Sequence, residues 1–116
     1  MIAQVAPDQT LPVGERSQVS GDRKSQINGG TIRGNNLFHS FQQFSIPTGG
    51  SAAFNNPANI TNILTRVTGS NISNIDGLIR ANGTANLFLI NPNGILFGAN
   101  ARLSTHAQLF IYSFSY

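Results

Sequence analysis

The 116 residues of the chain suffice for one domain, and only 9% of them are charged whereas 40% are hydrophobic. So many apolar residues exclude a simple disordered chain, although the charged fraction is far below the usual ~25%. The net charge of +3 comes from scattered basic residues, which argues against a nucleic-acid partner, and the absence of cysteine excludes disulfides and thiolate metal sites.

Residues 1–25 are polar and show little hydrophobic periodicity. We expect an extended leader here, with one strand at most. Met1-Ile2 leads directly into Ala3-Gln4, without the cationic and apolar regions of a signal peptide. The protein is therefore either cytosolic or written without a signal that was removed near Ala3, and the sequence leaves both readings open.

From Ile27 the sequence alternates short apolar runs with glycine and asparagine corners, which predicts strands joined by tight turns. Phe38, Phe41 and Phe44 interrupt this pattern with a spacing of three. That spacing predicts one helical turn or an irregular aromatic cap rather than a strand, with the rings in the hydrophobic core.

Further strands are expected at residues 51–54, 60–68, 77–81 and 85–90. Residues 60–68 also fit a helical spacing, but six of these nine residues are β-branched, which favours a strand. The Asn82-Gly83 corner alone predicts an antiparallel hairpin. Runs that are apolar on both faces favour parallel stacked strands instead.

The tetrad Asn91-Pro92-Asn93-Gly94 separates two apolar runs, residues 87–90 and 95–97. Pro92 presets φ for the first corner of a turn, Asn91 can bond forward from its opening position, and glycine suits its exit. We predict a type I turn between two strands that are buried on both faces.

In residues 104–116 the side chains of Phe110, Tyr112, Phe114 and Tyr116 alternate as one face of a strand. A chain that ends on an exposed apolar strand is prone to aggregate. We therefore expect a divergent tail that reflects a truncation.

The whole pattern predicts an all-β protein. No exact repeat is visible, but glycine and asparagine corners recur every 8–15 residues. Such pieces build solenoids, in which each coil of roughly 20–50 residues buries its inward side chains on the next.

The sequence contains few residues that could support catalysis. The chain has four acidic residues, none close to another in sequence, and its two histidines, His39 and His106, are far apart. No paired carboxylates, metal-ligand spacing or phosphate-binding loop is present. We predict a protein that is not an enzyme and has no cofactor and no metal, and we expect His39 to be a partly buried packing residue.

Five segments, in order, resemble the amino-terminal secretion domain of filamentous-haemagglutinin-type exoproteins, as in cyanobacterial members of two-partner secretion systems. Residues 7–12 also resemble the start of the mature family members. The five segments are 27–31, 36–44, 63–69, 73–79 and, most specifically, Asn-Leu-Phe-Leu-Ile-Asn-Pro-Asn-Gly-Ile-Leu-Phe-Gly at 86–98.

The resemblance implies a right-handed parallel β-helix over residues 26–103, incomplete at its C-terminal end, between the leader 1–25 and the tail 104–116. It implies a secreted or cell-surface exoprotein that leaves the periplasm through an outer-membrane β-barrel transporter with periplasmic domains. The domain then nucleates β-helix folding of a long adhesin-like passenger, which would carry any cell-surface or glycan targets.

Carried over by position, the transporter-recognition motif is Asn91, Pro92, Asn93, Gly94 and Ile95, and a secondary aromatic element is Phe38, Phe41 and Phe44. The tetrad could equally be no more than a β-helix corner. A β-helical carbohydrate-binding or carbohydrate-cleaving protein and a non-functional truncated remnant remain as alternatives.

Overall fold

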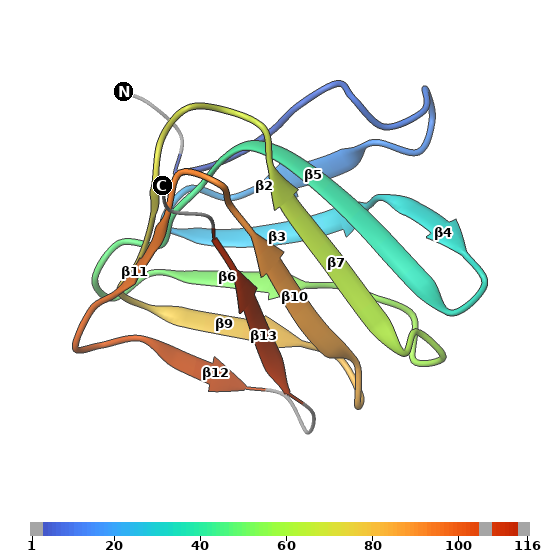
Figure 1. Cartoon of the computed structure of the whole chain (residues 1–116). Coiled ribbons are helices and arrows are strands. Elements are labelled where there is room, and N and C mark those ends of the chain that lie inside the picture. Colours follow the sequence, from blue (N-terminus) through green and yellow to red (C-terminus); the bar gives the residue numbers. More distant parts are fainter. Residues whose placement is uncertain (1–3, 105–107, 114–116) are drawn as a thin grey trace.

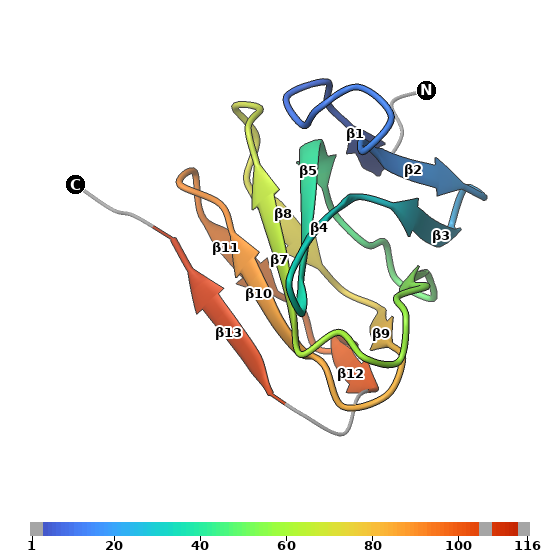
Figure 2. The same cartoon turned by 90° about the vertical axis from the view of Figure 1, so that its right-hand side faces the viewer.

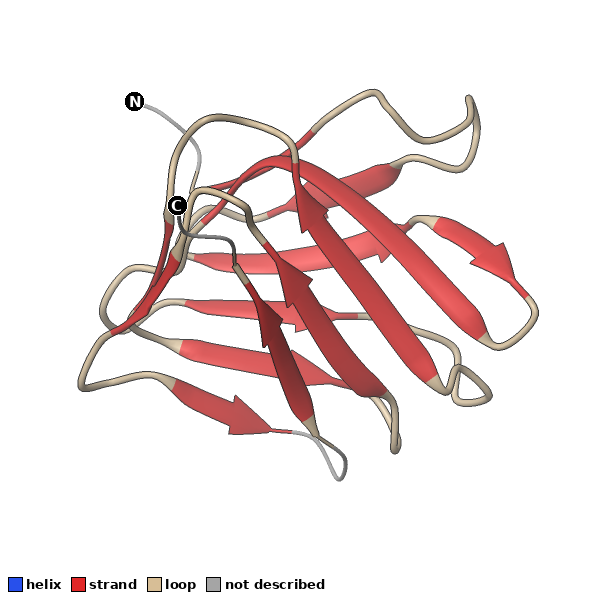
Figure 3. Cartoon of the chain, viewed as in Figure 1, coloured by secondary structure: helices blue, strands red, loops and turns tan. Residues whose placement is uncertain are grey.

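The computed structural model describes residues 4–104 and 108–113 (Figure 1). These residues form strands, turns and loops, with no helix among them (Figure 3). In chain order the strands are β1 (Val5–Pro7), β2 (Ser17–Ser20), β3 (Lys24–Gly29), β4 (Thr31–Arg33), β5 (Asn36–Phe44), β6 (Ser51–Phe54), β7 (Asn62–Val67), β8 (Ser73–Ile75), β9 (Leu78–Ala81), β10 (Asn86–Ile90), β11 (Ile95–Phe97), β12 (Arg102–Ser104) and β13 (Leu109–Tyr112).

The chain winds into a three-sided solenoid of parallel strands. One side, the front sheet, contains β5, β7, β10 and β13 in that order, and the opposite rear sheet contains β3, β6, β9 and β12 (Figure 2). The narrow third side pairs β8 with β11, and Ile46 bridges to Ile75 there. All of these neighbours are parallel, so the predicted parallel β-helix is confirmed.

Successive coils stack in register and bury one inward side chain on the next. Leu37 pairs with Ile63, and Ile63 with Leu87, and all three are buried. The core clusters around such columns and includes Ile27, Phe54 and Ile79 from the rear sheet. Strand alternation places the other side chains on the outside of the solenoid.

Antiparallel strands cover the first coil. β2 pairs with β3, while β1 and β4 pair with β5. The prediction of a leader with at most one strand was therefore wrong for residues 1–25, which contain β1, β2 and the first residues of β3. These strands are short and weakly apolar because they bury only one face.

The helical or irregular prediction for Phe38, Phe41 and Phe44 was also wrong, because all three lie in β5. Pairing with β1 matches Phe44 to Val5 and Phe41 to Pro7 and shows a register shift at this point. The shift is a β-bulge, which resets the in–out alternation of the strand. Phe41 and Phe44 therefore both point into the core, with ring centroids 5.3 Å apart, while Phe38 is only partly buried.

Two further differences concern the last coils. β11 was predicted to be buried on both faces, but Leu96 is 59% and Phe97 46% exposed, because β11 lies on the narrow side and pairs with β8 alone among the described strands. Conversely, β13 pairs with β10 in register, so the coil pattern continues through Leu109–Tyr112. Phe114 and Tyr116 lie outside the described residues.

His39 has the predicted packing role, but it is fully rather than partly buried, at 2% exposed. Its ring lies 5.8 Å from that of Phe41 and 5.4 Å from that of Phe54, and Nδ1 forms a 2.9 Å hydrogen bond with Ser17 Oγ. Burial lowers the pKa of His39 to about 4 from its ordinary 6.5. The folded domain therefore holds the imidazole neutral.

Between pH 6.5 and 4 the unfolded chain binds a proton at His39 that the folded domain excludes, so stability falls as the pH is lowered through this window. We expect a loss of about 3 kcal/mol between pH 7 and 4 from this residue. Urea denaturation at several pH values measures it. The His39→Gln variant should lose this slope, because glutamine does not titrate. An unchanged slope in His39→Gln would refute the assignment.

Candidate functional site

The tetrad at residues 91–94 forms the corner between β10 and β11. The amide of Gly94 donates to the carbonyl of Asn91 over 3.1 Å, which closes a β-turn with Pro92 and Asn93 at its two central positions. The amide of Asn93 donates to Asn91 Oδ1 over 2.9 Å, and Gly94 has a φ of 124°, which glycine adopts without strain. The predicted turn is therefore present at the predicted residues.

Asn91 is fully buried and all of its side-chain hydrogen-bonding groups have partners. Its Nδ2 donates to the carbonyl of Asn71 at 3.1 Å and to Ser73 Oγ at 2.9 Å. Its Oδ1 accepts from the amide and from Nδ2 of Asn93. This side chain fixes the corner onto the preceding coil.

The other residues of the predicted motif differ in accessibility. Pro92 and Asn93 are exposed, and Asn93 Nδ2 donates to the carbonyl of Gly69 at 2.7 Å. Ile95 is partly buried and packs against the core. The folded surface therefore presents Pro92 and Asn93, whereas Asn91 belongs to the interior.

The three phenylalanines lie on one strand, β5, but do not share one face of it. Phe41 and Phe44 are in the core, and Phe38 belongs to the outer face of the front sheet. Side-chain amides nevertheless connect the end of β5 to the tetrad corner. Asn71 Nδ2 donates to Gln43 Oε1 at 3.1 Å, and the carbonyl of Asn71 accepts from Asn91. Gln43 and Asn71 were missed in the sequence, because only the stacking of coils brings them to Asn91.

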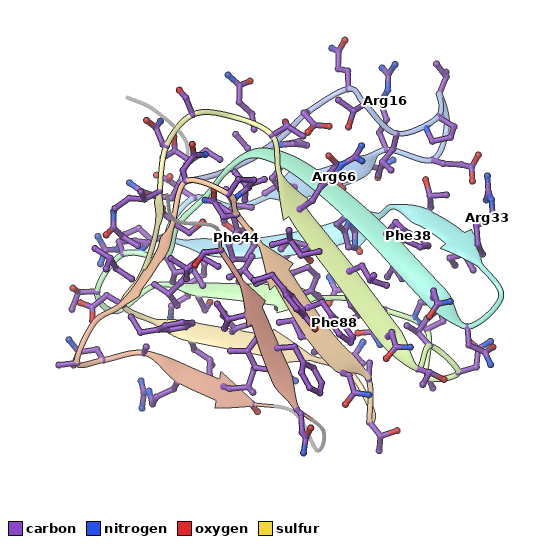
Figure 4. The ribbon with its side chains drawn as sticks, in the orientation of Figure 1. Arg16, Arg33, Phe38, Phe44, Arg66 and Phe88 are labelled. Atoms are coloured by element: carbon purple, nitrogen blue, oxygen red, sulfur yellow. The ribbon has the colours of Figure 1, made fainter. Side chains whose placement is uncertain are left out.

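An apolar column crosses the outer face of the front sheet. Phe38, Leu64, Phe88 and Phe110 occupy the same register position on β5, β7, β10 and β13, and all are partly exposed. The rings of Phe88 and Phe110 stack with centroids 4.8 Å apart and planes at 14°. Phe38 and Phe88 are labelled in Figure 4 together with Arg66, from the next outward position of β7.

A pocket of about 200 Å³ lies at the start of this column. It is lined by Leu11, Phe38, His39, Leu64, Arg66 and Ile90. Leu11 belongs to the loop between β1 and β2, so the pocket lies where the N-terminal segment meets the front sheet. We call residues 8–12 the strap.

The strap is held by the carboxylate of Asp8. It accepts hydrogen bonds from the amide and hydroxyl of Thr10 at 2.9 and 2.8 Å, and from the hydroxyls of Ser40 and Thr68 at 2.6 Å each. Burial raises the pKa of Asp8, but these bonds outweigh it and lower the pKa to about 2. A single side chain thus joins the strap to β5 and to the end of β7.

The comparisons with known proteins give one result. The model of the TPS (two-partner secretion) secretion domain matches residues 3–109. The chain belongs to this family. No curated protein and no solved structure gives a significant match.

The TPS domain match begins just before β1, which precedes the strap, and ends at the first residue of β13. It therefore includes the tetrad, the aromatic strand and the strap. The family comprises non-catalytic secretion domains, so the match indicates a secreted exoprotein, and members of the family in general have an outer-membrane transporter as their partner.

Two features are absent from the described residues. No three His, Cys, Asp or Glu side chains lie close enough to hold a metal ion in this part of the chain. Nor is there, over residues 4–104 and 108–113, a helix long and apolar enough to cross a membrane.

The Asn91→Ala substitution should destabilise the TPS domain by about 2–3 kcal/mol, because it leaves Ser73, the carbonyl of Asn71 and the donors of Asn93 without their buried partner. Asn71→Ala is the matched control, since it removes one exposed side-chain hydrogen bond at the same corner and should cost below about 1 kcal/mol. Urea denaturation compares them. Equal losses would refute the anchoring role of Asn91.

Asp8→Asn should lower the stability of the domain by about 1 kcal/mol, because an amide cannot accept all four hydrogen bonds and the site is partly open to solvent. Hydrogen exchange of the backbone amides should accelerate more in the strap than in the remainder of the domain. Asp22→Asn, at an exposed turn, is the control. In the unaltered domain the stabilisation that ionised Asp8 provides should be lost as the pH falls from 3.8 towards 2, because folding lowers the pKa of Asp8. Unchanged exchange in the strap would contradict the role of Asp8.

Proposed function

We propose that this TPS domain targets a large adhesin-like or haemagglutinin-like exoprotein to its outer-membrane β-barrel transporter. The periplasmic domains of the transporter recognise residues 91–95 in the extended chain. The domain then folds outside the cell, where the protein is released or stays at the surface. The passenger that follows carries any binding to cell-surface or glycan targets.

The burial of Asn91 is the observation that supports recognition before folding. In the folded domain both polar atoms of its side chain are engaged by Asn71, Ser73 and Asn93. A binder of the complete motif needs these atoms free, which requires the extended chain. An extended segment can add to a sheet edge of the receptor through main-chain hydrogen bonds, with alternate side chains read by pockets.

The register of the coils supports a role in nucleation. Each coil offers its successor a parallel edge and a set of inward side chains, as Leu87 on β10 does for Leu109 on β13. Solenoids gain most of their stability from such neighbour interfaces, so folding spreads from a formed coil to the next. Folding on the far side of the membrane would bias the movement of the chain outward.

The carbohydrate-binding alternative receives less support from the aromatic column. Sugars stack on exposed ring faces, but Phe88 and Phe110 are nearly parallel at 4.8 Å, so they cover the faces of each other. Carbohydrate cleavage would need a pair of carboxylates across the bond. Of the acidic side chains, Asp8, Glu15 and Asp76 are each engaged in hydrogen bonds within the domain.

Export of the chain tests the proposal. The chain, preceded by a signal peptide, is produced in a bacterial host with or without its cognate transporter, and secreted protein is measured. The double variant Pro92→Ala/Asn93→Ala should reduce secretion at least ten-fold. The matched control is Asn55→Ala/Pro57→Ala, which removes an exposed asparagine and an exposed proline from another corner and should be exported normally.

Denaturation of both purified double variants shows whether each still folds. Equal export of the two would mean that residues 91–95 serve only as a corner. If the unaltered chain is secreted equally with and without the transporter, the targeting function is refuted. That result would favour the non-functional truncated remnant.

A further inference from the structure

The outer face of the front sheet is more apolar than a solvated sheet face requires. Beside the column formed by Phe38, Leu64, Phe88 and Phe110, the next outward row contains Ile90 on β10 and Tyr112 on β13. Phe88 lies 6.3 Å from Tyr112 between ring centroids. Outward positions of a solvated sheet are normally polar, so an apolar patch of this extent indicates an interaction surface.

An extended segment already covers one end of this face. The strap crosses β5 and the end of β7, where Asp8 holds Ser40 and Thr68 and where Leu11 lines the pocket. Ser40, although it points outward, is 1% exposed under this segment. Beyond Leu11 the same face continues over β10 and β13, where Phe88, Ile90 and Phe110 are partly exposed.

Arg66 places a positive charge at the wall of the pocket. Its Nε donates to Ser40 Oγ at 2.8 Å and its Nη2 to Thr10 Oγ1 at 2.6 Å. Both hydroxyls in turn donate to the Asp8 carboxylate, so they separate the guanidinium from that carboxylate and hold it in place. Among the described residues Arg33 and Glu15 form the salt bridge that the structure shows, and Arg66 makes no direct ion pair with a carboxylate there. A guanidinium fixed beside apolar side chains suits a carboxylate supplied from outside.

We propose that this face binds an extended peptide segment of a partner protein, running on from the strap across β7, β10 and β13. The segment places an apolar side chain in the pocket beside Leu11 and Leu64 and a carboxylate on Arg66. This surface exists only when the coils are stacked. It is therefore independent of the recognition of residues 91–95 in the extended chain, and either proposal can fail without the other.

Fluorescence anisotropy with the folded 116-residue chain tests the proposal. The probes are two labelled eight-residue peptides, one alternating leucine with glutamate and one alternating leucine with lysine. The glutamate peptide should bind at least ten-fold more tightly. Arg66→Gln should remove this preference, Arg66→Lys should retain most of it, and Phe88→Ser should weaken binding at least ten-fold.

Two substitutions control for net charge and for exposed apolar area. Arg80→Gln removes an exposed arginine from β9 of the rear sheet, and Leu96→Ser removes an exposed leucine from β11, so both should leave binding unchanged. Circular dichroism checks that each variant folds, and if Phe88→Ser does not, the Arg66 and Arg80 pair decides alone. Equal binding of both peptides, or equal effects of Arg66→Gln and Arg80→Gln, overturns the proposal. The proposal is also overturned if sedimentation shows a dimer of the chain that excludes the peptide and that persists in the Arg66→Gln variant.

Discussion

The register between coils is the constraint on which the rest of this domain depends. Each position stacks directly on its counterpart one coil away, at the ~4.8 Å spacing of neighbouring strands. Inside, Leu37, Ile63 and Leu87 form one apolar column. Outside, Asn62 Nδ2 donates to Asn36 Oδ1 at 3.0 Å, and Asn86 Nδ2 to Asn62 Oδ1 at 3.3 Å. In these two columns each side chain therefore stacks on a neighbour of its own kind.

This constraint explains the unusual composition. A charge repeated in an outward column would meet a like charge at strand spacing, which destabilises a sheet. An amide has a donor and an acceptor, so it can pair with an identical amide in both directions. The corners follow the same rule: Asn56 Oδ1 accepts from the amide of Asn82, and Asn82 Nδ2 donates to the carbonyl of Asn56. Few charges and many asparagines are what in-register stacking favours.

The sequence predicted most strands and the solenoid, because corners and short apolar runs are local signals. It also contained a repeat that was missed: Asn36-Leu37-Phe38, Asn62-Ile63-Leu64 and Asn86-Leu87-Phe88 fall on equivalent positions of three coils. The strand at Phe41 and Phe44 was misread because a bulge allows a spacing of three on one face. The turn at Asn91 was predictable from Pro92 and Gly94. The partners of Asn91, which are Asn71 and Ser73, could not be predicted because only the stacking of coils brings them together. The same holds for Leu11 and Arg66, which line one pocket because of the path of the strap. No local sequence pattern encodes either arrangement.

The antiparallel strands at the first coil have a consequence for self-association. β1, β2 and β4 occupy the edges on which another parallel coil would otherwise add, and they run in the wrong direction for that repeat. Pro7 in β1 has no amide hydrogen to offer, and the register shift beside it bends the edge. Another molecule therefore cannot continue the parallel coil repeat through this end.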